Sequence, residues 1–254
     1  MQNNAIKTFW QKLDKSFEGK LIKCETSFLH LMKDIMTTKV LNKFLVEWNT
    51  VRGGDGMKPV VHPMDIDRLY VTDGNNNLNH LSVNGGKDWK YLTLPRSSDG
   101  EYLRPFLADP NDTLRIYTAY RELYRSENAG GSWRPLGVPR SSSGIIAVAI
   151  APSDPKVIYV AFSQPCWNDE VSGKLFYTSD GGSTWKDISK GLRGVAWNNI
   201  SCIAVHPADP GTVVVGFRGG WSVKAMVSFT GGTGDKPWSE LSRGLPVSGD
   251  VNAL

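Results

Sequence analysis

The sequence predicts an all-β protein, a β-propeller of four blades with a short helical extension at its N-terminus. A glycine-rich motif that ends in tryptophan occurs four times among the 254 residues. The four tryptophans are separated by 44, 52 and 53 residues, and each interval contains short apolar runs bounded by turn residues. A repeat of this length, without helical periodicity, is typical of the four-stranded blade of a propeller.

The N-terminal extension, residues 1–44, differs from the rest of the chain because its apolar residues recur at helical spacing. Two amphipathic helices are expected, with a break near Gly19. Their apolar faces need a partner surface, which is the following domain, another chain or a membrane surface. The residues that define the two faces are Ile6, Phe9, Trp10, Leu13 and Phe17, and then Phe28, Met32, Ile35, Met36 and Val40.

The propeller is expected to cover residues 45–254, and its blades repeat one order of elements. An apolar strand ends in a turn rich in proline or aspartate, and a second β-rich strand follows it. A third strand leads into the glycine-rich motif, and a fourth strand begins with the tryptophan. The blades are expected at about residues 57–92, 101–136, 144–188 and 200–241.

Partial strands flank the four blades. Residues 48–51 match the fourth-strand pattern without a preceding hairpin, and residues 251–254 match a first strand. We therefore expect an incomplete ring, which leaves sheet edges open to a second copy of the chain. The alternatives are that the N-terminal helices cover these edges or that the sequence is part of a longer protein.

The repeated motif has the pattern Ser/Thr-x-Asp/Asn-x-Gly-x-Ser/Thr/Asp-Trp, and we interpret it as a structural hairpin rather than an active site. Glycine supplies a positive φ, and the aspartate or asparagine accepts backbone N–H groups within the turn. The tryptophan is expected to pack between blades. The motif residues are Ser82, Asn84, Gly86 and Trp89; Ser126, Asn128, Gly130 and Trp133; Thr178, Asp180, Gly182, Thr184 and Trp185; and, in a looser copy, Ser228, Gly232 and Trp238.

This motif and its period resemble the Asp-box, or bacterial neuraminidase repeat, β-propellers. That superfamily includes sialidases, xyloglucanase-type glycoside hydrolases, the sortilin receptor domain and photosystem assembly factors. The resemblance covers about residues 45–254 and is closest to the xyloglucanase and sortilin branch. It implies that the box is a turn on the face away from the ligand. The sialidase branch fits less well, because it needs an Arg-Ile-Pro segment that this sequence lacks.

Asp73 is the one position to which the resemblance carries a catalytic role. In xyloglucanases a Tyr-x-x-Thr-Asp-x-Gly-Gly segment contains the catalytic base, and residues 70–74 resemble it with one residue fewer. The family's catalytic acid comes from a second propeller, which this sequence does not contain. An inverting glycosidase needs two carboxyl groups roughly 6.5–9.5 Å apart, so Asp73 alone is insufficient. Its alternative roles are ligand binding and turn formation.

The loops opposite the boxes form the expected ligand-binding face. Indole rings stack on sugar rings, while carboxylates and amides bond their hydroxyl groups, so three tryptophans on one rim suggest a carbohydrate. The alternatives are that these tryptophans cap loops or pack between blades, or that the face binds a protein. Besides Asp73, the face is expected to contain Asp55, Asn75, Arg121, Glu122, Trp167, Asp169, Glu170, Arg193, Trp197, Arg218 and Trp221.

Composition limits the classes of function. The net charge of +4 is small, which argues against a nucleic-acid-binding face. No metal or cofactor is expected, because the sequence contains no Cys-x-x-Cys pair and no histidine cluster. No apolar run is long enough to span a membrane, and no signal peptide is evident. The resemblance nevertheless suggests an extracellular or cell-envelope location.

The predicted function is binding or scaffolding without catalysis, with a polysaccharide or a protein as the ligand. The alternative is a xyloglucanase-type glycoside hydrolase that uses Asp73 and a second carboxylate. Asp169 and Glu170 are the candidates for that second carboxylate, because they form the acidic pair in the longest loop of the face.

Overall fold

The structure of the protein is a computed structural model that describes residues 56–73, 79–95, 105–139, 143–163, 174–192, 199–218 and 225–241, without the side chains of 56–58, 72, 73, 79 and 199. These residues belong to one unit of the chain, Val51–Leu254. The expected helices of residues 1–44 and the partial strands at 48–51 and 251–254 lie outside the described residues. No helix in the described ranges is long and apolar enough to cross a membrane.

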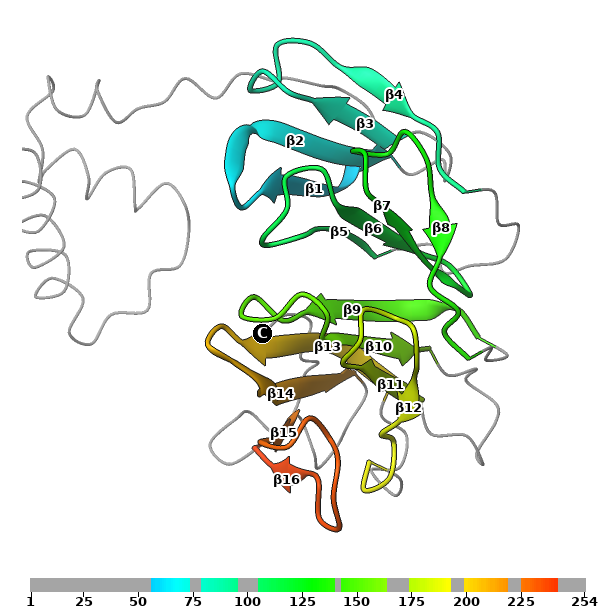
Figure 1. Ribbon diagram of the computed structural model, residues 1–254, viewed down its shortest axis with the longest axis vertical. Coiled ribbons are helices and arrows are strands. Elements are labelled where there is room, and N and C mark those ends of the chain that lie inside the picture. Colours follow the sequence, from blue (N-terminus) through cyan, green and yellow to red (C-terminus); the bar gives the residue numbers. More distant parts are fainter. Residues whose placement is uncertain are drawn as a thin grey trace, which may run out of the picture. The chain divides into compact units, whose positions relative to one another are not determined.

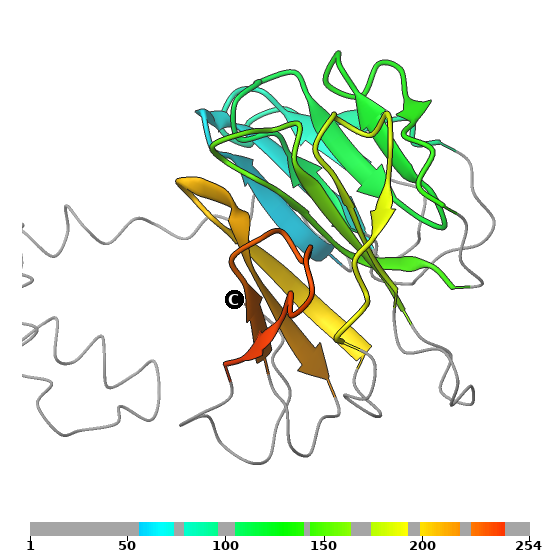
Figure 2. The same cartoon turned by 60° about the horizontal axis from the view of Figure 1, so that its bottom comes forward.

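The described residues form four antiparallel sheets of four strands, which confirms the predicted all-β propeller architecture (Figure 1). We number the sheets blades 1 to 4 in chain order. The first and fourth strands are the edges of each sheet, as β13 and β16 show in Figure 2.

The strands of each blade follow one another along the chain. Blade 1 contains β1 (Gly56–His62), β2 (Asp65–Asp73), β3 (Asn79–Ser82) and β4 (Lys90–Leu92). Blade 2 contains β5 (Phe106–Ala108), β6 (Ile116–Ala119), β7 (Leu123–Ser126) and β8 (Arg134–Pro135). Blade 3 contains β9 (Ile145–Ile150), β10 (Ile158–Phe162), β11 (Leu175–Thr178) and β12 (Lys186–Asp187). Blade 4 contains β13 (Asn199–His206), β14 (Asp209–Arg218), β15 (Ala225–Ser228) and β16 (Ser239–Glu240).

Inner strands are apolar and outer strands are short and exposed. All five residues of β10 are buried, as expected where both faces of a strand are covered. Its β-branched and aromatic residues also favour an extended backbone. Both residues of β12 are exposed. This outer strand begins one residue after Trp185 rather than at it, because the first backbone pair of the hairpin joins Lys186 to Tyr177.

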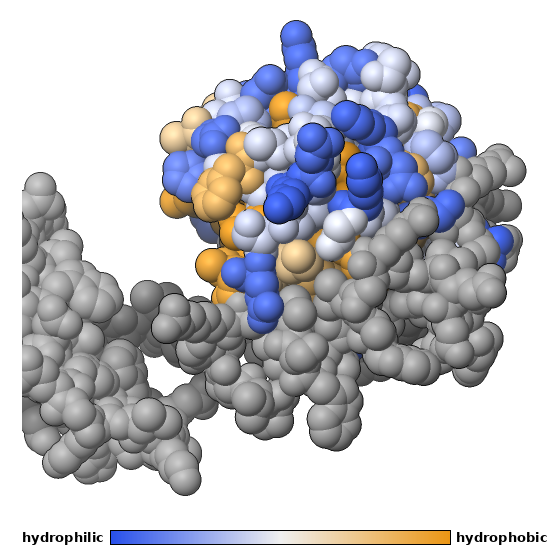
Figure 3. Space-filling view, turned by 90° about the horizontal axis from the view of Figure 1, so that it is seen from below, coloured by the Kyte–Doolittle hydropathy of each residue, from blue (hydrophilic) through white to orange (hydrophobic). Residues whose placement is uncertain are grey.

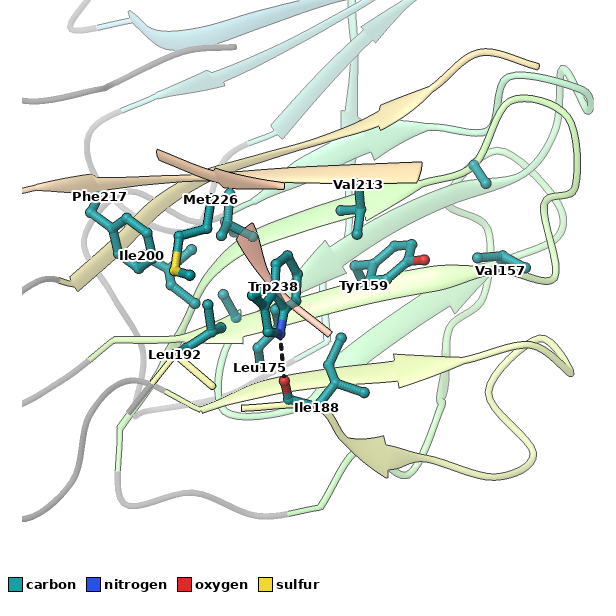
Figure 4. Close-up of a cluster of buried hydrophobic side chains, with 14 residues drawn as sticks. Val157, Tyr159, Leu175, Ile188, Leu192, Ile200, Val213, Phe217, Met226 and Trp238 are labelled. Atoms are coloured by element: carbon teal, nitrogen blue, oxygen red, sulfur yellow. Dashed lines mark hydrogen bonds between the residues drawn. The ribbon is translucent and has the colours of Figure 1, made fainter. Parts of the chain in front are cut away.

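Three clusters of buried side chains lie between successive blades. Between blades 1 and 2, the rings of Tyr70 and Phe106 lie 5.2 Å apart, and Ile116 is buried beside them. A second cluster, around Tyr117 and Phe176, joins blades 2 and 3. The cluster between blades 3 and 4 is drawn in Figure 4 and includes Tyr159, Leu175, Ile188, Val213, Phe217, Met226 and Trp238. The core is therefore a series of blade junctions.

Each junction also contains a hydrogen bond from a box tryptophan to the preceding blade. The indole N–H of Trp238 donates to the carbonyl of Ile188 at 3.1 Å (Figure 4). The equivalent bonds run from Trp185 to Leu136 at 2.8 Å and from Trp133 to Thr93 at 2.9 Å. The tryptophans therefore join the blades by polar contacts as well as by packing, and for Trp238, which is buried, the bond supplies the acceptor that its indole N–H needs.

In blades 2, 3 and 4, one glycine of the box packs closely on the preceding blade. Gly232 has a φ of +74°, and a Cβ atom there would lie 2.7 Å from Cδ1 of Ile188. Gly182 and Gly130 approach Leu136 and Leu92 in the same way, with Cβ distances of 3.1 and 2.8 Å. Glycine is required here for its positive φ and for the close approach of the backbone.

Backbone hydrogen bonds place the boxes on the same face as the turns between first and second strands. In blade 3, the N–H of Gly181 donates to the carbonyl of Lys156 at 2.9 Å. The equivalent bonds join Gly85 to Asp67, Ala129 to Leu114, and Gly231 to Gly211. We call this the box face. Connections between second and third strands leave from the other ends of the strands, on the opposite face.

Candidate functional site

The carboxylate of Asp180 is bound within its own turn. Its Oδ1 atom accepts hydrogen bonds from the hydroxyl of Thr178 at 2.7 Å and from the backbone N–H groups of Ser183 and Thr184 at 2.9 Å. Its Oδ2 atom accepts the hydroxyl of Thr184 at 2.6 Å. These bonds, that of Thr184 foremost, hold the pKa of Asp180 well below its usual range. Both oxygens are thus used to shape the hairpin.

Uncharged side chains do the same work in the other boxes. Asn84 Oδ1 accepts the hydroxyl of Ser82 at 2.9 Å and the backbone N–H of Asp88 at 3.0 Å. Asn128 makes the equivalent bonds at 3.0 and 2.8 Å, and blade 4 has Thr230 at this position. In blades 1 to 3 the turn therefore needs an acceptor rather than a negative charge. In blade 4 the hydroxyl of Thr230 instead donates to the carbonyl of Thr233 at 2.6 Å.

Part of the predicted ligand-binding face lies among the described residues. Arg121 and Glu122 lie in the connection between β6 and β7, and Arg218 ends β14. Asp73 ends β2, where its backbone pairs with Gly56. The remaining predicted residues lie outside the described ranges; they are Asp55, Asn75, Trp167, Asp169, Glu170, Arg193, Trp197 and Trp221.

The connection between β6 and β7 is a tight turn with Arg121 at its tip. The N–H of Tyr120 donates to the carbonyl of Glu122 at 2.9 Å, and the carbonyl of Tyr120 accepts the N–H of Ile145, in blade 3, at 2.6 Å. The hydroxyl of Tyr124 donates to Oε2 of Glu122 at 3.1 Å. The side chain of Arg121 is exposed. A guanidinium and an oriented carboxylate thus lie side by side along the chain, and both can bond polar ligand groups.

Tyr124 is a site residue that the sequence reasoning missed. Its ring meets that of Tyr120 nearly edge to face, with centroids 6.1 Å apart and an interplanar angle of 83°. Its hydroxyl orients Glu122, so it supports the site from within strand β7. The signal in the sequence was the short spacing, because Glu122 immediately precedes β7 and Tyr124 is the second residue of that strand.

Asp73 differs from the residues at its position in the other blades. The residues paired with the first serine or threonine of each box are Leu69, Ile116, Ile158 and Val213. Four positions further on, the blades carry Asp73, Tyr120, Phe162 and Phe217. The three aromatic side chains are at most 2% exposed. The register thus assigns an aspartate to a position that holds a buried aromatic residue in the other three blades, which singles out Asp73 independently of its flanking residues.

Known proteins share this architecture. A family model described as Sortilin, neurotensin receptor 3 (Sortilin-Vps10) matches residues 78–215, more than half of the chain. An ancestral GH74 enzyme is 18% identical with a TM-score of 0.55, over 76% of this chain and 25% of that one. The GH74 enzyme of Niastella koreensis is 19% identical with a TM-score of 0.54, over 73% of this chain and 30% of that one. The chain therefore spans less than a third of either enzyme.

No match was found among curated proteins. The two enzyme structures support the propeller fold. The family match runs through the boxes of blades 1, 2 and 3, and it confirms the resemblance to Asp-box propellers that those boxes predicted. The chain belongs to the Sortilin-Vps10 family.

Proposed function

We propose that this chain is a propeller segment that binds polysaccharide on the face opposite the boxes, without catalysis. The observation that carries this proposal is the turn between β6 and β7. Arg121 is exposed there beside Glu122, whose carboxylate is oriented by Tyr124 at 3.1 Å. The backbone bond from Ile145 fixes the turn to the next blade. Groups that are held in place before binding lose less conformational freedom when a ligand arrives.

The box face is the poorer candidate for a ligand. The oxygens of Asp180 accept hydrogen bonds from its own hairpin, and Asn84 and Asn128 replace it in two other boxes. On the opposite face the polar groups lie in the connections between strands. In this proposal Trp167, Trp197 and Trp221 supply the flat apolar surfaces on which sugar rings stack.

The proposal includes the organisation and setting of the chain. The propeller covers residues 45–254, and residues 1–44 form a separate extension. The binding face works outside the cell or in the cell envelope, where structural polysaccharides are found. This setting follows from the family resemblance.

A second candidate function is glycoside hydrolysis with Asp73 as the general base. The observation that favours it is the departure of Asp73 from the buried aromatic position of the other three blades. An inverting reaction needs a second carboxyl group roughly 6.5–9.5 Å away as the general acid. Asp169 and Glu170 are the candidates in this chain.

Calorimetric titration of the full chain with soluble xyloglucan and mixed-linkage β-glucan tests the binding proposal. We expect Arg121→Ala and Glu122→Gln each to weaken binding by about tenfold, the value of one charge-assisted hydrogen bond. Arg134→Ala is the matched control, because Arg134 is exposed and pairs with Glu127 of the box. The proposal would be contradicted if the chain bound neither polysaccharide. It would also be contradicted if Arg121→Ala and Arg134→Ala lowered the affinity equally.

The hydrolytic alternative has a separate readout, the release of reducing ends from the same polysaccharides. If it is correct, the full chain releases them and Asp73→Asn stops the release while binding persists. If the unchanged chain binds but releases none, hydrolysis is ruled out for these substrates and the binding function stands.

A further inference from the structure

The first and last described blades expose the two halves of one junction. We call the side of a blade that packs on the blade before it its preceding side, and the other its following side. On the preceding sides of blades 2, 3 and 4, Ile116, Ile158 and Val213 are 0% exposed. Leu69 holds the equivalent register position in blade 1 and is only partly buried. The preceding side of blade 1 is therefore an apolar sheet face with incomplete cover.

The innermost strand of blade 1 has the same character. Val61 pairs with Leu69 and is 56% exposed. Its equivalents in the other blades, Ala108, Ile150 and Val205, all pack in the junction clusters. Pro59, two residues earlier, is exposed, whereas its equivalent Phe106 is buried. Positions that are packed in a junction in the other blades are thus accessible to solvent in blade 1.

Trp89 also departs from the other box tryptophans. Trp133, Trp185 and Trp238 donate their indole N–H to the preceding blade. Trp89 instead donates to the carbonyl of Gly86, in its own box, at 2.9 Å. Blade 1 thus has the box tryptophan that donates across a junction in the other blades, but the indole N–H of Trp89 is bonded within its own box.

The following side of blade 4 exposes its outer edge at Leu241, whereas Val227 and Ala225 on the same side are buried. Leu92, Leu136 and Ile188 each lie three residues after a box tryptophan, beneath the box glycine of the next blade, and are 6%, 4% and 1% exposed. Leu241 lies three residues after Trp238 and is 48% exposed. The backbone of Leu241 holds the equivalent position in blade 4. Its N–H donates to the carbonyl of Ala225, just as the N–H of Ile188 donates to the carbonyl of Leu175 in blade 3.

We propose that two copies of this chain associate head to tail, with blade 4 of one copy against blade 1 of the next. This contact repeats the three junctions within the chain. Gly86 packs on Leu241 of the other copy, and the indole N–H of Trp89 turns from Gly86 to the carbonyl of Leu241. The repeat itself supplies the complementarity, since each following side already fits a preceding side of the same design. A second copy at the open edges is one of the three outcomes that the sequence left open.

The number of described blades also fits a closed ring of two copies. The described blades of two copies number eight, which is within the range of four to eight typical of propellers. A head-to-tail contact uses two different surfaces, so it closes into a ring when the rotation between copies allows it. Closure satisfies both open sides at once, because each copy contributes one preceding and one following side.

Apolar exposure elsewhere supplies controls. The described surface in Figure 3 is mixed, with apolar side chains in orange among polar ones. Ile66, the second residue of β2, is 80% exposed, and Phe229 is 68% exposed in the box of blade 4. Both lie on the box face rather than on a side that packs against another blade. A general tendency of apolar surface to associate would involve these residues, whereas the proposed junction does not.

Light scattering after gel filtration of the full chain tests the association. We expect a mass of twice 28.0 kDa for the unchanged protein. Val61→Glu and Leu241→Glu each place a charge in the junction, and both are expected to give the mass of a single chain. Ile66→Glu is the matched control and keeps the mass of the unchanged protein. Circular dichroism verifies that each variant is folded, and Pro59→Glu replaces Val61→Glu if the latter is not.

A mixing experiment distinguishes head-to-tail from symmetric pairing. Val61→Glu retains an intact blade 4 side and Leu241→Glu an intact blade 1 side, so the mixture forms a one-to-one complex although each variant alone is single. A symmetric pairing through one side alone could not be restored in this way. A single-chain mass for the unchanged protein, association that survives both variants, or a mixture that stays single would each overturn the proposal.

Discussion

Trp238 and Ile188 are joined by a hydrogen bond of 3.1 Å although they lie 50 residues apart in the chain. Gly232 packs on the same isoleucine, so one residue of blade 3 receives both the polar and the close backbone contact that hold blade 4. The same pair of contacts recurs on Leu136, which receives Trp185 and Gly182. The stability of the propeller therefore depends on a small set of residues at each junction.

Replacing Trp238 by phenylalanine is expected to lower the free energy of unfolding by about 1–3 kcal/mol. The smaller ring leaves part of the junction unfilled, and the carbonyl of Ile188 loses its donor. Urea denaturation followed by circular dichroism measures the change. Phe229→Leu, at an exposed position, should stay within about 0.5 kcal/mol of the unchanged protein. Equal losses in the two variants would mean that Trp238 does not stabilise the junction.

A comparison of Gly232 with Gly137 separates the two reasons for glycine in a box, which are the positive φ and the close approach of the backbone to another blade. Both have a positive φ, +74° and +63°, but a Cβ at Gly232 would lie 2.7 Å from Ile188 whereas nothing lies within 4 Å at Gly137. Gly137→Ala introduces backbone strain alone and should cost about 1 kcal/mol. Gly232→Ala adds overpacking and should cost about 1–3 kcal/mol more. Thermal unfolding of both variants checks the difference, and similar melting temperatures would show that the junction accommodates the extra methyl group.

Asp180 should make the stability of the protein sensitive to acid. Its pKa is lowered in the folded state, so the ionised form stabilises the fold above the ordinary carboxyl pKa of about 3.9. This stabilisation is lost as the pH falls through the lowered value. Asp180→Asn retains an acceptor, as Asn84 does in blade 1, and should fold with a melting temperature that declines less steeply below about pH 5.

The acid series has its own control. Asp235→Asn removes an exposed carboxylate from the segment between Gly232 and Trp238 of blade 4, which makes none of the hydrogen bonds of Asp180. It should keep the pH dependence of the unchanged protein. If Asp180→Asn has the same slope as Asp235→Asn, the hydrogen bonds of the box do not favour the ionised aspartate.

Ala129 is a place where the protein can be stabilised. It has a φ of +53°, whereas the equivalent residues Gly85, Gly181 and Gly231 are glycines in the same region. Because a side chain is strained there, Ala129→Gly should raise the free energy of unfolding by about 0.5–1 kcal/mol. Ala208→Gly, in an exposed turn outside the positive-φ residues, should instead lower it slightly. Chemical denaturation of both variants measures the two signs, and a loss at Ala129 would contradict the expectation.

The parts of the fold that depend on one hairpin could be predicted from the sequence. Asn84 shares its turn with Ser82 and Asp88, so the motif was enough to indicate their hydrogen bonds. The acceptor of Trp133 could not be predicted in this way. Thr93 lies 40 residues earlier, and the bond exists because two blades pack against each other.

The candidate site shows the same division. Arg121 and Glu122 were predicted because a connection between strands places polar residues on one face. The contact of Tyr124 with Glu122 went unnoticed because Tyr124 belongs to a strand and was treated as framework. The departure of Asp73 from Tyr120, Phe162 and Phe217 became visible once strand register aligned the four blades.

The junction bonds also bear on how such a chain changes through gene duplication. At each junction between described blades, one box indole donates to a carbonyl that lies three or four residues after the preceding box tryptophan. Inserting or deleting a whole stretch from one box tryptophan to the next in frame leaves each remaining donor with an acceptor of the same kind, as in other repeat proteins whose units contact only their neighbours. Blade number is thus a property that recombination can alter without the invention of a new interface.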